Sequence, residues 1–144
     1  MVSSERGYSY DELDIGMQAT FSKTISESDV YLFAGITGDF NPMHVNEAYA
    51  KTTRFGSRIV HGPLTLSLGA SILGTKLPGL GTIAISMETK FLAPVFFGDT
   101  VTVIGEVAEK LPKNRVRITL LYLNQHDKPV AEGSVLVSPP PKRS

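Results

Sequence analysis

The sequence predicts an α+β fold in which one curved antiparallel β-sheet wraps around a buried central α-helix. Residues 62–76 are apolar or small on every side of a helix, which indicates a helix surrounded by protein. After residue 82 the apolar residues change to a period of two, which is typical of strands with one buried face. A helix and a sheet that each need cover form two packed layers, so both patterns lead to the same architecture.

The chain before the central helix is expected to supply one strand and two helices. Residues 17–24 alternate weakly and predict the strand, and Ser26-x-x-Asp29 is a start signal for the first helix. Gly38 is expected to end that helix. Residues 47–53 predict the second helix, which is short.

The central helix and the strands after it define the shape. Pro63 suits the first turn of the helix, and Pro78-Gly79 follows its last turn. Four strands are expected in an antiparallel meander, at residues 82–92, 100–107, 116–123 and 130–137. This is the hot-dog fold. One such sheet leaves an edge strand that needs protection, so we expect a homodimer.

Length and composition indicate one domain. With 144 residues, of which 42% are hydrophobic, the chain can bury a full core, which we place in residues 1–137. Residues 138–144 are rich in proline and are expected to form a flexible tail.

Charge and cysteine content exclude several classes of function. Fourteen basic and fourteen acidic side chains give no net charge, so nothing favours nucleic acid or an anionic membrane surface as a partner. The absence of cysteine excludes disulfides and thiolate sites and fits a reducing compartment. The first 14 residues do not resemble a signal peptide, and no stretch approaches the roughly 20 apolar residues of a membrane span. We therefore expect a cytoplasmic protein.

Residues 38–44, Gly-Asp-Phe-Asn-Pro-Met-His, are the most informative segment. Asn41 is biased toward an extended backbone before Pro42, and the two residues suit the N-cap and first position of a short helix. The resulting bend can bring Asp39 and His44 together around one water, as an acid/base pair requires. A surface turn would explain the same residues. The functional reading is favoured because Val60-His61-Gly62-Pro63 follows at the start of the central helix.

Residues 33–44, Phe-Ala-Gly-Ile-Thr-Gly-Asp-Phe-Asn-Pro-Met-His, followed by Ile-Val-His-Gly at 59–62, resemble the hydratase motif of the MaoC-like family. This family comprises (R)-specific enoyl-CoA hydratases, which are also 3-hydroxyacyl-CoA dehydratases. The resemblance extends from about residue 10 to residue 137. It implies reversible syn hydration of a trans-2-enoyl-CoA to an (R)-3-hydroxyacyl-CoA, with an acyl-CoA thioester as substrate and no cofactor.

By this resemblance Asp39 and His44 are the catalytic pair. Addition of water to C3 needs a base for the water and an acid for C2, and two groups that grip one water can serve both steps. Asp39 is the better candidate for the base, whereas His44 would orient the water and share the proton transfer. Which group protonates C2 stays open. Asn41 is expected to shape the turn rather than to react.

Gly62 is expected to bind the thioester oxygen. The enolate-like state carries charge on this oxygen, and a free N–H at a helix N-terminus can stabilise it. Gly62 is the natural donor because Pro63 has no N–H, although a glycine that only lets the chain turn is compatible with the same sequence. His61 is expected to have a supporting role, holding the loop before the helix.

Three features are left open. Some relatives have a serine where the alignment through His61-Gly62 places Ala70, and Ser67 or Ser71 could substitute for it. No metal is expected, because Asp39 and His44 supply two ligands and no convincing third is apparent. The CoA phosphates would rest on surface Lys or Arg that the sequence does not identify.

Two other functions compete with the hydratase. A thioesterase would need a water directed at the carbonyl carbon, which the spacing of Asp39 and His44 disfavours. A non-catalytic acyl-thioester binding subunit would not need the intact pair. Acyl chain length and the choice between CoA and a carrier protein stay open.

Overall fold

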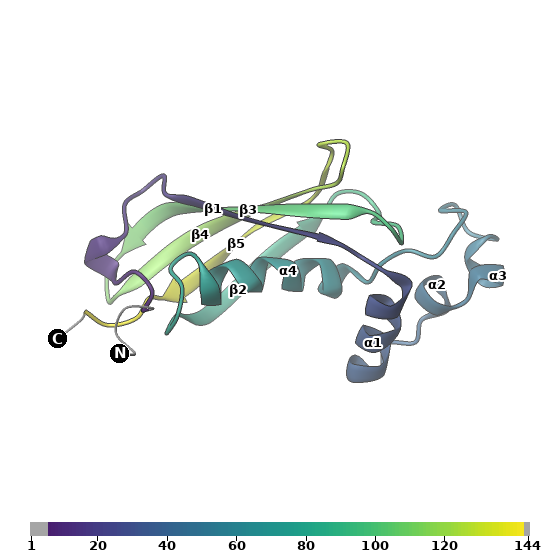
Figure 1. The fold of residues 1–144 in the computed structure, drawn as a ribbon, viewed down its shortest axis with the longest axis horizontal. Helices are drawn as coiled ribbons and strands as arrows, with labels where there is room; N and C mark the ends of the chain where they lie inside the picture. Colours follow the sequence, from purple (N-terminus) through teal and green to yellow (C-terminus); the bar gives the residue numbers. More distant parts are fainter. Residues whose placement is uncertain (1–5, 143–144) are drawn as a thin grey trace.

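The computed structural model describes residues 6–142 and has the predicted α+β hot-dog architecture. A five-stranded antiparallel sheet curves over one long helix, α4, as Figure 1 shows. The strands lie side by side in the order β1-β3-β4-β5-β2. Their bounds are β1 (Gln18–Thr24), β2 (Ile83–Phe91), β3 (Thr100–Leu111), β4 (Arg115–Leu123) and β5 (Pro129–Ser138).

The helices are α1 (Glu27–Thr37), α2 (Pro42–Val45), α3 (Glu47–Ala50) and α4 (Gly62–Thr75), and a 3-10 turn, η2 (Tyr10–Glu12), precedes β1. The second predicted helix is shorter than expected, since α3 ends at Ala50. The hydroxyls of Thr52 and Thr53 donate to the carbonyls of Tyr49 and Ala50. Threonine hydroxyls that bond the backbone in this way compete with helix continuation.

The hydrophobic core lies between the sheet and α4. The alternation predicted for β3 is confirmed, because Val101, Val103 and Val107 are all buried. They belong to the same cluster as Leu68, Leu73 and Ile72 of α4. Alternation in the strands therefore supplies the surface that covers the helix.

The predicted meander was wrong at its first strand. Strands β3, β4 and β5 are consecutive neighbours, but β2 pairs with β5 at the edge opposite β1. Residues 92–99 cross from one strand to the other instead of turning back. Eight residues reach about 26 Å, whereas the three strand spacings between β2 and β3 add up to about 14 Å. The Val60 N–H donates to the carbonyl of Val95 at 2.8 Å, which pairs this crossing with the chain before α4.

Two surfaces predicted to be buried are exposed in the single chain. The alternating apolar residues of β2 lie on an edge strand, where Ile83 is 61% and Ile85 47% exposed. Helix α4 is covered on one side only, since Ser67 and Ala70 are exposed. A helix enclosed on every side was therefore not found, because one five-stranded sheet cannot surround it.

The ends of the chain bear on two further predictions. Within residues 6–142, none of the helices has the length and apolar character needed to span a bilayer. The predicted tail includes residues 143–144, which lie outside the described residues. Of the rest, Ser138 ends β5, and Pro139 and Pro140 are buried.

The three short helices position the site. In Figure 1, α1, α2 and α3 lie beyond the end of the sheet, next to the N-terminal end of α4. Strand β1 leads into α1, and the segment after α3 returns to α4. The loop between α1 and α2 is thereby brought to the start of the central helix.

Candidate active site

The segment between α1 and α2 folds as its residues predict. Gly38 ends α1 with a φ of 81°, in the left-handed region that favours glycine, and its N–H donates to the carbonyl of Ala34. The Asn41 side chain accepts a hydrogen bond from the Met43 N–H at 3.1 Å, and Pro42 opens α2. The chain therefore changes direction between Asp39 and His44.

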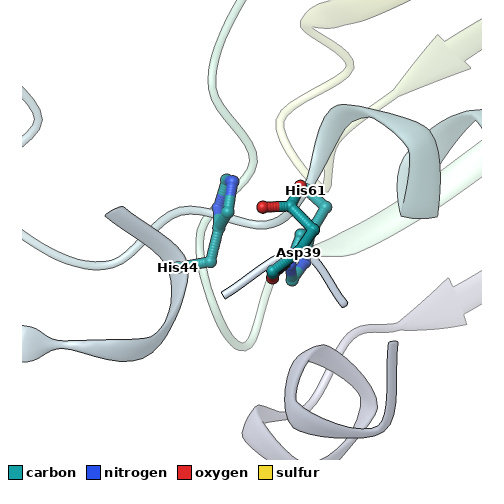
Figure 2. A group of neighbouring side chains, drawn as sticks. All are labelled: Asp39, His44 and His61. Carbon is teal, nitrogen blue, oxygen red and sulfur yellow. Dashed lines mark hydrogen bonds between the residues drawn. The ribbon is translucent and has the colours of Figure 1, made fainter. Parts of the chain in front are cut away.

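This change of direction brings together Asp39, His44 and His61. One nitrogen or carboxylate oxygen from each of the three residues lies within 4.8 Å of the others. Figure 2 shows the Asp39 carboxylate directed toward the His44 ring. Within the described residues no hydrogen bond joins these two side chains directly. A water with hydrogen bonds of about 2.8 Å can contact two atoms at such a separation, so the geometry suits a pair that shares one water.

The His44 ring is fixed by a backbone carbonyl. Its Nδ1–H donates to the carbonyl of Ile59 at 2.7 Å, and the neutral ring therefore carries a lone pair on Nε2. Burial lowers the pKa of His44 below its ordinary value of 6.5. The Ile59 carbonyl opposes this shift, the His61 ring adds to it, and the Asp39 charge opposes it. A neutral imidazole with a free Nε2 can accept from a water or orient it.

His61 is fully buried beside the pair. Its Nε2–H donates to the backbone carbonyl of Asp39 at 3.0 Å, so it contacts the loop after α1 as well as the helix that it precedes. With Asp39 and His44 it forms a group of three residues whose side chains each offer one metal-ligating atom. This third ligand had not been identified from the sequence. Only its Nδ1 carries a lone pair for such a bond, because Nε2 is the donor to Asp39.

A pocket of about 290 Å³ opens beside the pair. Most of its wall is apolar, and of the predicted site residues it contacts His44 and Gly62 but not Asp39, Asn41 or His61. The Gly62 N–H has no acceptor within residues 6–142. The lining residues are His44, Arg54, Phe55, Ile59, Val60, Gly62, Thr65, Phe91, Leu92, Ala93, Pro94, Val95 and Val130. An apolar chain with a carbonyl near Gly62 matches this lining.

The hydroxyl-bearing residue of α4 that lines the pocket is neither of the two serines considered from the sequence. Ser67 and Ser71 donate to the helix carbonyls of Pro63 and Leu68, each at 2.7 Å, and neither they nor Ala70 line the pocket. The hydroxyl-bearing residue of α4 that lines the pocket is Thr65, which is 2% exposed. Its position three residues after Gly62, on the same helix face, is the signal that could have identified it.

Known proteins similar in sequence have named activities. A model of the MaoC like domain matches residues 12–125. The (R)-specific enoyl-CoA hydratase of Rhodospirillum rubrum is 44% identical over 131 residues, which cover 91% of this chain and 91% of that protein. The 3-hydroxybutyryl-CoA dehydratase of Methylorubrum extorquens is 44% identical over 133 residues, which cover 92% of this chain and 85% of that protein.

The solved structures give the same relationship. The unliganded R-hydratase PhaJ1 of Pseudomonas aeruginosa matches with a TM-score of 0.89 and 43% identity, covering 94% of this chain and 88% of that one. The (R)-hydratase of A. caviae, involved in PHA biosynthesis, matches with a TM-score of 0.86 and 37% identity, covering 89% of this chain and 98% of that one. The resemblance in the motif is therefore confirmed, and the chain belongs to the MaoC-like domain family.

Proposed function

We propose that the protein is an (R)-specific enoyl-CoA hydratase, which in the reverse direction is a 3-hydroxyacyl-CoA dehydratase. The observation that carries this proposal is that Asp39 and His44 lie together beside a mostly apolar pocket, which is lined by Gly62, a residue whose N–H has no acceptor within residues 6–142. The names of the similar proteins agree with it.

In the proposed reaction, Asp39 removes a proton from a water that His44 orients. The water oxygen bonds to C3, the C2–C3 π bond opens, and negative charge moves to the thioester oxygen. The Gly62 N–H donates to this oxygen, where a preorganised donor stabilises the transition state more than the substrate. A proton from the same pair then reaches C2. Hydroxyl and hydrogen are thus added to one face, and no metal or cofactor enters any step.

Asn41 and His61 act on this reaction indirectly in the proposal. The Asn41 side chain caps α2, which carries His44, so it shapes the turn. The His61 ring bonds the backbone of Asp39, which agrees with a role in holding the loop before α4.

Incubation with crotonyl-CoA tests the function. A hydratase consumes the enoyl thioester without releasing thiol, and chiral analysis should identify (R)-3-hydroxybutyryl-CoA. Thiol release would indicate a thioesterase, and neither reaction would indicate a binding subunit. In heavy water the deuterium at C2 should lie on the face that carries the hydroxyl. An (S) product would contradict the proposed arrangement.

We further propose that the protein acts as a homodimer in the cytoplasm. Strand β2 is an edge strand with exposed apolar side chains, and unpaired edges of this kind are normally covered. Pairing of β2 with its own copy would continue the sheet antiparallel and bury these residues, as an isologous contact does.

A further inference from the structure

We propose that His61 is a positioning residue that holds the catalytic pair and the Gly62 donor in one arrangement. The inference rests on the hydratase function proposed above. It assigns to His61 a part in turnover rather than only in the packing of the loop before α4.

One ring contacts both members of the pair. The Nε2–H of His61 donates to the Asp39 carbonyl at 3.0 Å, which fixes the backbone from which the carboxylate extends. The ring also stacks on His44, with centroids 4.0 Å apart and planes 28° apart. Phe33 packs at 4.8 Å from the His61 centroid. Figure 2 shows the three polar side chains as one group. His61 therefore limits the movement of Asp39 and His44 relative to each other.

The backbone of the same residue connects this group to the oxyanion donor. His61 is the N-cap of α4 and is bonded covalently to Gly62, whose N–H faces the thioester oxygen in the proposed reaction. The His61 carbonyl accepts from the N–H groups of Leu64 and Thr65, at 3.1 and 3.2 Å. The position of the ring and the direction of the Gly62 N–H are thus set by one residue.

The hydrogen bonds determine the tautomer of His61. A carbonyl oxygen only accepts, so the proton that bonds Asp39 is on Nε2. Nδ1 is buried and has no hydrogen-bond partner within the described part of the chain. A second proton there would be an unsatisfied buried donor, which is costly. The Nε2–H tautomer is therefore the one that supports Asp39.

Two substitutions separate the hydrogen bond from the packing. His61→Phe keeps an aromatic ring against His44 but removes the donor, whereas His61→Gln keeps an N–H donor but removes the ring. Displacement of a catalytic group by about 1 Å can cost on the order of 100-fold in rate. We expect His61→Phe to lower kcat about 100-fold with KM changed less than about threefold, and His61→Gln to keep about ten times more turnover than His61→Phe. His126→Phe, at an exposed loop position, is the control for the same chemical change.

A kcat for His61→Phe at or above that of His61→Gln would show that the hydrogen bond does not position the pair. If the decrease in kcat parallels the decrease in unfolding temperature in both variants, His61 contributes to folding alone. If His61→Phe does not fold, the tautomer of His61 in the unaltered protein tests the proposal instead. Long-range ¹H–¹⁵N spectra should show His61 protonated at Nε2, and protonation at Nδ1 would overturn the proposal. Because this measurement needs no turnover, it also separates failure of this inference from failure of the hydratase function.

Discussion

The ring of Phe91, at the end of β2, lies directly against the backbone of Gly62 at the start of α4. A Cβ built on Gly62 would meet the ring carbon Cζ of Phe91 at 3.0 Å and Cε1 at 3.1 Å. Both residues line the pocket. A side chain at position 62 would therefore require the Phe91 ring to move by a few tenths of an ångström. This packing effect is separate from the proposed approach of a thioester to the Gly62 N–H, and an experiment must distinguish the two.

We expect Gly62→Val to reduce turnover by about 10²–10³-fold, the typical cost of losing one oxyanion donor. Combining it with Phe91→Leu should relieve the contact with the ring and raise the unfolding temperature. It should not restore turnover, because the valine still crowds the N–H. A folded Gly62→Val enzyme with near-normal kcat would place the oxyanion site elsewhere.

Asp39 and His44 should act as one unit. Asp39→Asn and His44→Gln should each lower kcat by orders of magnitude while leaving the fold largely intact. The double variant should lose far less than the product of the two effects, because residues that share one step are non-additive. Steady-state kinetics of the three variants checks this. Fully multiplicative losses would indicate that the two residues do not share a water.

The neutral form of His44 should persist below pH 6.5. Burial lowers the pKa of His44 from 6.5, so this ring becomes protonated at a lower pH than an exposed histidine. If the neutral ring orients the water, the midpoint of the His44-dependent loss of kcat/KM should lie below pH 6.5. NMR titration of the ring measures the pKa independently. A value above 6.5 would mean that the partly buried site favours the charged form.

The Tyr122 hydroxyl should stabilise the contact between the sheet and α4. It donates to the Leu66 carbonyl at 2.8 Å, beside Gly69, where a Cβ would lie only 2.3 Å from the hydroxyl oxygen. Tyr122→Phe should cost about 1 kcal/mol in urea unfolding, the usual net value of such a bond. Gly69→Ala should be more harmful, because the clash involves a fully buried ring.

Tyr122 should also contribute to the alkaline pH dependence of stability. Burial raises the pKa of Tyr122 from 10.0 to about 12. The folded state therefore holds this proton more tightly than the unfolded state, and the associated stability is present below pH 10 and lost as the pH rises toward 12. Urea midpoints measured across this range should fall less steeply for Tyr122→Phe. Equal slopes would show that the phenol is not protected in the folded protein.

The proposed dimer should depend on β2. Sedimentation equilibrium at micromolar concentration should give the mass of two chains, and Ile85→Lys should shift the population toward monomer, because a charge would be buried in the contact. Ile15→Lys is a matched control, since Ile15 is also exposed but precedes β1, at the opposite edge of the sheet. A monomer in the unaltered protein would refute the proposal.

The sequence by itself determined the local structure. Alternation in residues 100–107 predicted a half-buried strand, and β3 has it because side-chain direction alternates along any strand. Gly38 ended a helix and Asn41 began one, since both effects involve only neighbouring backbone groups. The motif containing Asp39 and His44 identified the family for the same reason: its residues are consecutive and readable in one segment.

Only the tertiary structure decided which distant residues meet. The pairing of β2 with β5 depends on where residues 92–99 cross, and no local pattern encodes the choice of neighbour. The hydrogen bond from His61 to Asp39 joins residues 22 positions apart in the sequence. Its acceptor is a backbone carbonyl, a group present in every residue, so the sequence contains no sign of it. The contact of Phe91 with Gly62 likewise depends on two elements packing together. Such contacts follow from the folded path of the whole chain, whereas helix ends and strand faces follow from the residues within them.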